Sequence, residues 1–148
     1  MSVELLNKDT VVKYLTDKKV ISTSDNAEVE VLTGGVSNVV LAITTANQKL
    51  VLKQALAELA VSEQWIADQR RAIVEADAIK LFNQLSPDQV PKLIFLDPER
   101  FILVLERVPV GSTVWKSDLL AGVINPDVGA GLGKTLATWH NYGEVTAS

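Results

Sequence analysis

The chain has 148 residues, of which 47% are hydrophobic and 22% charged, as expected for one globular domain or two small lobes. Its net charge is −4 and it has no basic block, which argues against a nucleic-acid partner. The chain has no cysteine, which excludes disulfides and thiolate catalysis, and its single histidine, His140, excludes a multi-histidine metal site. It shows no secretory signal and no apolar run near the ~20 residues that cross a bilayer, so we expect a cytoplasmic protein without a membrane partner.

The first part of the chain predicts one helix and three strands. Helical spacing from Asn7 to Lys19 indicates a short amphipathic helix, with Asn7 or Asp9 as its N-cap. Period-two alternation then predicts strands at 27–33, 37–45 and 49–56, separated by turn-forming residues. Because a parallel crossover needs a dozen or more residues, these short turns indicate an antiparallel meander.

The second part predicts a long helix, two more strands and further helices. The helix is expected from Ser62, as its cap, to Leu85, and residues 92–106 form two strands around an Asp97-Pro98 turn. After a connector, Pro126 suits the first turn of another helix. That helix carries an apolar stripe that needs a partner surface, Val128, Leu132, Leu136 and Trp139. The predicted fold class is α+β, with a five-stranded antiparallel sheet and a long helix.

Two glycines and a lysine lie on neighbouring predicted strands. In "GGVSN" the glycines let backbone N–H groups approach a ligand oxygen and tolerate positive φ, but taken alone the motif favours an ordinary hairpin turn. In "LVLKQA", Val51, Lys53 and Ala55 share one face of a strand that is apolar on both faces. The Lys53 ammonium therefore either has a buried partner or reaches water along its stem.

Glu75 is the predicted partner of Lys53. On a helical wheel it falls inside an apolar arc formed by Ala72, Val74, Ala78, Ile79, Phe82 and Leu85. A carboxylate there costs several kcal/mol unless it is paired, and Lys53 is the basic residue in a comparable apolar setting. We therefore predict a Lys53–Glu75 ion pair between sheet and helix; the alternative is a solvated Glu75 at the edge of the arc. A fixed lysine beside a glycine turn suits nucleotide phosphates.

These features together resemble the amino-terminal lobe of protein-kinase-like small-molecule kinases. More narrowly, "GGVSN", "LVLKQAL", "EQWIADQRRAIVEADAI", "VPKLIFLDPE" and "LATWH" look like the aminoglycoside phosphotransferase and methylthioribose kinase group, from about Val31 to His140. The resemblance implies a nucleotide-binding N-lobe with an N-terminal helix at 1–106, a hinge connector at 107–113, and the start of an incomplete helical C-lobe at 114–148.

The resemblance also implies an ATP site. The loop that covers the phosphates is matched by Gly34, Gly35, Ser37 and Asn38. Lys53 matches the lysine that contacts the α- and β-phosphates, and Glu75 its helix partner. The connector whose backbone binds adenine is matched by Glu106, Arg107 and Val108, and the candidates to pack near the base are Val36, Val51 and Leu105. His140 matches a histidine that ends the first long C-lobe helix, and we expect a structural role for it.

The chain departs from the family in its catalytic residues. The family's "HGD…N" segment and later aspartate follow the first C-lobe helix, whereas the last aspartate here is Asp127. No catalytic or metal-binding residue is therefore assigned, and magnesium is expected only with the missing C-lobe. We expect the ATP-binding portion of a phosphotransferase that transfers the γ-phosphate of ATP to a small-molecule hydroxyl, inactive alone.

Two alternatives stay open. One is a non-catalytic module with a kinase-like lobe that binds nucleotide or protein, and the other is an α+β interaction domain whose resemblance is only architectural. The apolar stripe on the last helix favours a truncated kinase, in which the uncovered stripe would promote a homo-oligomer.

Overall fold

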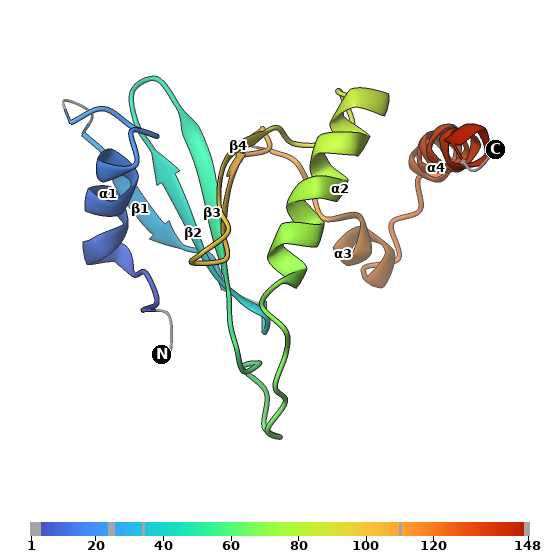
Figure 1. The fold of residues 1–148 in the computed structure, drawn as a ribbon. Coiled ribbons are helices and arrows are strands. Elements are labelled where there is room, and N and C mark those ends of the chain that lie inside the picture. Colours follow the sequence, from blue (N-terminus) through green and yellow to red (C-terminus); the bar gives the residue numbers. More distant parts are fainter. Residues whose placement is uncertain (1–3, 24–25, 34, 110, 147–148) are drawn as a thin grey trace.

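A five-stranded antiparallel sheet with a helix on each face is followed by two further helices (Figure 1). The computed structural model describes residues 4–23, 26–33, 35–109 and 111–146. The elements in chain order are α1 (Lys8–Asp17), β1 (Glu28–Val31), β2 (Asn38–Thr44), β3 (Lys49–Ala55), α2 (Arg71–Leu85), β4 (Leu93–Asp97), β5 (Ile102–Glu106), α3 (Trp115–Leu120) and α4 (Pro126–Thr146). This α+β architecture confirms the predicted fold class and is compatible with a kinase-like N-lobe followed by a few helices.

The strand order in the sheet is β1-β2-β3-β5-β4, and every neighbouring pair is antiparallel. The last strand of the sheet in sequence, β5, therefore lies between β3 and β4. Its residues Ile102 to Leu105 are all buried, because both of its edges are paired and both of its faces are covered. Short turns explain why β1, β2 and β3 are neighbours in the sheet. The position of β5 instead follows from its pairing with β3, which is distant in the sequence.

Helix α1 packs on one face of the sheet. Asn7 is its N-cap: the Asn7 side chain accepts hydrogen bonds from the amides of Asp9 and Thr10, and the Thr10 hydroxyl accepts one from the Asn7 amide. These bonds satisfy amides that the first helical turn leaves free. The core on this face is formed by α1, its flanking segments and alternate residues of β2, β3 and β5, including Val11, Leu15, Leu41, Ile43, Leu52 and Val104.

Helix α2 packs on the opposite face through small side chains. Ala72 and Ala76 are buried against Ala55 and Leu103, with Ile79 packed beside them. Since alanine projects little from the helix, the α2 backbone can approach the sheet closely. The predicted apolar arc was wrong about Val74, which is 69% exposed, because the contact with the sheet follows the Ala72–Ala76–Ile79 line.

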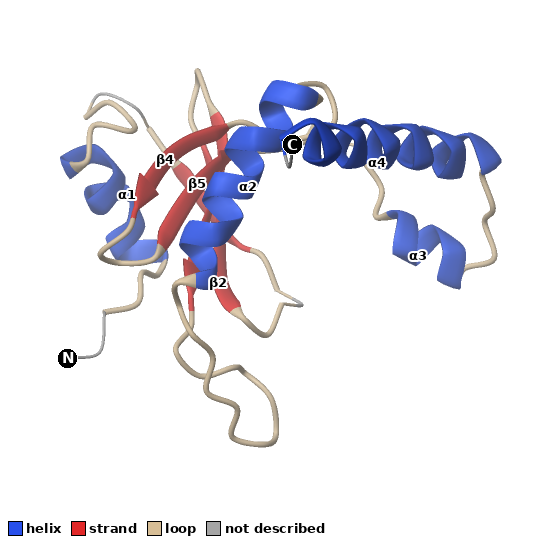
Figure 2. Ribbon diagram, turned by 45° about the vertical axis from the view of Figure 1, so that its right-hand side comes forward, coloured by secondary structure: helices blue, strands red, loops and turns tan. Residues whose placement is uncertain are grey.

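Helix α2 begins at Arg71 rather than at Ser62. The prediction of an earlier start was wrong because residues 56–70 form a loop that makes its own antiparallel contacts, projecting beyond the sheet below α2 (Figure 2). Leu59 donates its amide to the Trp65 carbonyl at 2.9 Å, and Glu58 and Ile66 form an isolated β-bridge. These backbone bonds compete with the helical ones that a Ser62 cap would begin.

Helix α4 contacts the rest of the fold through α2. Pro126 is the first residue of α4, as predicted. On the apolar stripe, Val128, Leu132 and Leu136 are exposed, whereas Trp139 stacks on Phe82 of α2 with ring centroids 3.9 Å apart and donates its indole N–H to Ser86. His140 is exposed and lies before the last turn of α4, so its predicted place at the helix end was wrong.

A buried carboxylate ties α1 to the β4–β5 turn. Asp97, 4% exposed, accepts hydrogen bonds from the Tyr14 hydroxyl at 2.8 Å and from the amides of Glu99 and Arg100, and it pairs with Lys18 at 3.1 Å. Burial raises the pKa of Asp97, but the hydrogen bonds from Tyr14, Lys18 and Arg100 outweigh burial and hold the pKa below its ordinary value. Burial and the neighbouring Asp97 raise the pKa of Tyr14.

We predict that Asp97→Asn lowers the free energy of unfolding by about 2 kcal/mol, because charge-assisted hydrogen bonds are lost at a buried position. Asp17→Asn, which breaks an exposed pair with Lys13 on the same helix, is the matched control and should cost at most about 0.5 kcal/mol. Urea unfolding measures both values. Equal losses for the two variants would refute the role given to Asp97.

The Asp97 contribution should also depend on pH. A carboxyl whose pKa is lower in the folded than in the unfolded chain stabilises the fold above its unfolded pKa, and the stabilisation is lost as the pH falls through the folded pKa. The difference in unfolding free energy between wild type and Asp97→Asn should therefore shrink below about pH 4. A difference that stayed constant from neutral pH down to pH 2 would contradict this prediction.

Candidate functional site

Lys53 projects from the centre of the sheet toward α2. Strand alternation places Val51, Lys53 and Ala55 on the α2 face, while Leu50, Leu52 and Gln54 point toward α1. Lys53 is opposite Val40 of β2 and Leu103 of β5. Its side chain is 24% exposed, so the ammonium lies at the rim of an apolar surface rather than fully in water.

The predicted ion pair between Lys53 and Glu75 is present. The Lys53 ammonium donates a hydrogen bond to the Glu75 carboxylate, whose side chain is 36% exposed. Both alternatives, a lysine that reaches only water and a solvated glutamate, were therefore wrong. The pair forms because Ala72 and Ala76 bring α2 close to the sheet, and Glu75 lies beside their contact line.

The glycine turn precedes β2 at the end of the sheet reached by Ala55. Gly34 lies outside the described residues. Gly35 does not have positive φ, and a Cβ added there would meet no described atom within 4 Å, so its conformation does not require glycine. Asn38 is opposite Ala55, two residues along β3 from Lys53 and on the same face, and it donates a hydrogen bond to the Ser37 hydroxyl. The structure thus places Ser37 and Asn38 beside the Lys53 strand.

Arg71 was missed by sequence reasoning. Its guanidinium donates to the carbonyl oxygens of Ser37 at 2.6 Å and Leu56 at 2.8 Å, which joins the glycine turn to the end of β3. The Leu56 amide also donates to the Ser37 carbonyl at 3.0 Å, and the Ala60 amide donates to that of Val36 at 2.8 Å. The available sequence signal was that Arg71 precedes Glu75 by four residues, which places both on one helix face.

The connector residues Glu106 and Val108 lie toward the other end of the same strands. Glu106 is three residues from Leu103, or about 10 Å along β5 at ~3.3 Å per residue. The Glu106 amide donates a hydrogen bond to the Lys92 carbonyl, and the Arg107 amide donates one to the Lys49 carbonyl. Val108, in contrast, forms no hydrogen bond with any residue that the structure describes, so its backbone N–H and C=O are available to a ligand.

The three residues predicted to pack near the adenine base lie in two different places. Val51 and Leu105 are opposite each other on β3 and β5, on the same face as Lys53. Val36 is exposed in the glycine turn, away from the connector end of the sheet. The face between Lys53 and Val108 is therefore apolar, with a charged pair at one end and, at the other, backbone groups of Val108 that bond to no described residue.

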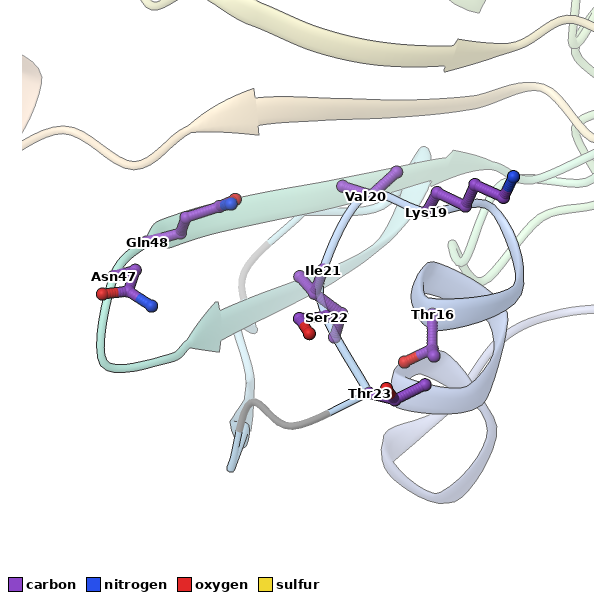
Figure 3. A pocket seen from close by; sticks show the side chains of 8 residues that line it. All are labelled: Thr16, Lys19, Val20, Ile21, Ser22, Thr23, Asn47 and Gln48. Carbon is purple, nitrogen blue, oxygen red and sulfur yellow. The ribbon is translucent and has the colours of Figure 1, made fainter.

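One cavity of the molecule lies away from this face. A polar cavity of about 680 Å³ lies between the end of α1 and the β2–β3 turn, where Asn47 and Gln48 lie at one end and Lys19 at the other (Figure 3). It contains none of the predicted site residues. Among residues 4–23, 26–33, 35–109 and 111–146, no three acidic or histidine side chains gather to hold a metal ion. Within the same ranges, no helix is long and apolar enough to cross a membrane.

In this antiparallel sheet, a lysine of the third strand pairs with a glutamate of the helix that packs on the sheet. This arrangement defines the class of the fold as a kinase-like amino-terminal lobe. No protein-family model matches the chain. Methylthioribose kinases do match it: that of Bacillus cereus (strain G9842) is 29% identical over 133 residues, which are 89% of this chain and 34% of the relative. That of Enterobacter sp. (strain 638) is 31% identical over 117 residues, 77% of this chain and 29% of the relative.

A third relative, the methylthioribose kinase of Citrobacter koseri, is 32% identical over 95 residues, 64% of this chain and 24% of the relative. The chain belongs to this methylthioribose kinase-like family of small-molecule kinases, and the matches are consistent with its amino-terminal part. It spans about a third of the length of the curated relatives it matches.

We predict measurable coupling between Lys53 and Glu75 in a double-mutant cycle of Lys53→Met and Glu75→Gln. Because both side chains are partly exposed, the coupling free energy should be about 0.5–1 kcal/mol. The more exposed Lys80–Asp77 pair of α2 is the matched control, and its coupling should be smaller. Urea unfolding of the four proteins in each cycle gives the values. Strictly additive effects at Lys53 and Glu75 would contradict the pairing.

Proposed function

We propose that this chain is the ATP-binding portion of a phosphotransferase that transfers the γ-phosphate of ATP to a hydroxyl group of a small molecule. In this proposal residues 1–106 form the nucleotide-binding lobe, 107–113 the hinge, and 114–148 the first part of a helical lobe. The observation that carries the proposal is the Lys53–Glu75 ion pair on the sheet face beside the glycine turn.

Lys53 would hold the α- and β-phosphates. A lysine fixed by a glutamate offers a counter-charge at a defined point, and phosphoryl transfer depends on such positioning. Gly34, Gly35, Ser37 and Asn38 would supply the loop over the phosphates. The Ser37 and Asn38 side chains add polar groups at the end of the sheet where Lys53 lies.

The adenine would lie toward the connector. Its hydrogen-bonding edge would meet the backbone groups of Glu106 and Val108, of which those of Val108 form no bond with the described residues. Val51 and Leu105, which share one face of the sheet, would contact one face of the base, because apolar side chains line most small-ligand sites while few polar groups set the orientation.

The acceptor would be a small-molecule alcohol, and methylthioribose is the first candidate because the relatives are named as its kinases. Phosphotransferases of this kind also need a catalytic aspartate and carboxylate or amide ligands for magnesium. The last aspartate of the chain, Asp127, lies in the first turn of α4, whereas the resemblance places those residues after that helix, so we assign no catalytic or magnesium-binding residue in this chain. Its contribution to the reaction would be to bind and orient ATP.

We predict that ATP raises the thermal stability of the 148-residue protein. ATP at 100 times its dissociation constant should add ~2.7 kcal/mol to the unfolding free energy. Lys53→Ala should lose most of this stabilisation, whereas Lys80→Ala, which removes an exposed lysine of α2, should keep it. Differential scanning fluorimetry across an ATP titration measures the effect. An unchanged melting temperature of the wild type at millimolar ATP would overturn the proposal.

We further predict that the 148 residues alone do not transfer phosphate. Purified protein with Mg-ATP and methylthioribose should form no ADP above background in a coupled assay, while a full-length methylthioribose kinase serves as the positive control. ADP formation that required both methylthioribose and Lys53 would contradict this prediction and would show that the chain contains a complete catalytic site.

A further inference from the structure

We propose that Arg71 is a positioning residue that holds the glycine turn in place relative to the Lys53–Glu75 pair, and thereby sets the affinity of the site for nucleotide phosphates. This inference rests on the proposed function. It concerns a side chain that does not itself need to touch the nucleotide, since its hydrogen bonds go to backbone carbonyls of the turn and of its neighbours.

The Arg71 guanidinium joins three separate segments. One terminal nitrogen, Nη2, donates to the carbonyls of Ser37 at 2.6 Å and Leu56 at 2.8 Å, and the other, Nη1, donates to the carbonyl of Asp68 at 2.9 Å. These carbonyls belong to the glycine turn, the residue after β3 and the approach to α2. A displacement of the turn from β3 or α2 would therefore break at least one bond of this side chain.

The fork shape of the side chain matters for this role. The guanidinium is planar and carries five donors in a fixed arrangement, whereas the lysine ammonium is a compact point charge on a flexible stem. The three carbonyls are bonded by two separate terminal nitrogens, which the fork of the guanidinium provides and the single ammonium nitrogen of lysine does not. Arg71 also lies one helical turn before Glu75 on the same face, so the helix that fixes the lysine also fixes the glycine turn.

Arg71 also brings a charge to the site, and this charge has to be separated from its positioning role. The Lys53 and Glu75 charges balance each other, while Arg71 forms no ion pair with any residue that the structure describes. Its charge also acts on the exposed carboxylate of Asp68, which pairs with Arg70. A charge effect and a positioning effect can be separated, because lysine at this position would keep the charge and lose the fork.

The experiment compares Arg71→Gln and Arg71→Lys with the wild type. Arg70→Gln is the matched control, because Arg70 is the neighbouring arginine and its side chain pairs with the exposed Asp68 carboxylate. Isothermal titration calorimetry gives the dissociation constants of ATP and of adenosine, which lacks phosphates. Amide hydrogen exchange of Leu56 and Ala60 reports the turn directly, because these amides bond to the carbonyls of Ser37 and Val36.

We expect Arg71→Gln to bind ATP about tenfold more weakly, the scale of one lost charge-assisted hydrogen bond. Its affinity for adenosine should stay unchanged, and exchange at Leu56 and Ala60 should accelerate. Arg71→Lys should behave like Arg71→Gln, and Arg70→Gln like the wild type.

Three results would overturn the inference: unchanged ATP affinity in Arg71→Gln, full affinity in Arg71→Lys, or an equal loss for ATP and adenosine. The first would exclude any role, the second would leave only a charge effect, and the third would indicate general damage to the fold. A wild type that binds neither ligand would instead overturn the proposed function and this inference with it. The wild-type titration therefore distinguishes the two failures.

Discussion

The contact between Lys53 and Glu75 determines how the rest of the site is arranged. The two side chains come from a central strand and from the helix that packs on the sheet through Ala72 and Ala76, and this packing brings the two charges together. Since both are partly exposed, the pair adds little to the stability of the fold. Its importance is positional: it places one ammonium at a defined point near the glycine turn.

The two faces of the sheet serve different purposes. The α1 face is the larger apolar core, and its polar groups are satisfied internally: buried Gln54 bonds to the backbone of Leu6 and Glu4, and Asp97 bonds to Tyr14 and Lys18. The α2 face has a smaller core, built from Ala55, Ala72, Ala76 and Leu103. Stability is thus concentrated on one face, which leaves charged and polar groups of the other face accessible to a ligand.

The sequence predicted the elements whose signals are local. Period-two alternation predicted the first three strands, two apolar runs around the Asp97-Pro98 turn predicted the last two, and Asn7 and Pro126 marked the beginnings of α1 and α4. The sequence also predicted the Lys53–Glu75 pair, because an unpaired carboxylate against an apolar surface is costly. It failed at Ser62, where backbone contacts within residues 56–70 replace a helix, since such contacts leave no periodic pattern. Arg71 was missed because backbone carbonyls, its partners, have no residue-type signature.

By itself, the sequence determined the strand faces, the N-cap of α1 and the need for a partner at Glu75, because these follow from side-chain spacing and from the cost of burying charge. Only the tertiary structure decided that β5 lies between β3 and β4, that α1 and α2 cover opposite faces, and that Arg71 joins the glycine turn to the helix that carries Glu75. Pairing between distant strands depends on where the backbone lies in space, and so do hydrogen bonds to carbonyls. The order of side chains along the chain does not encode that position directly.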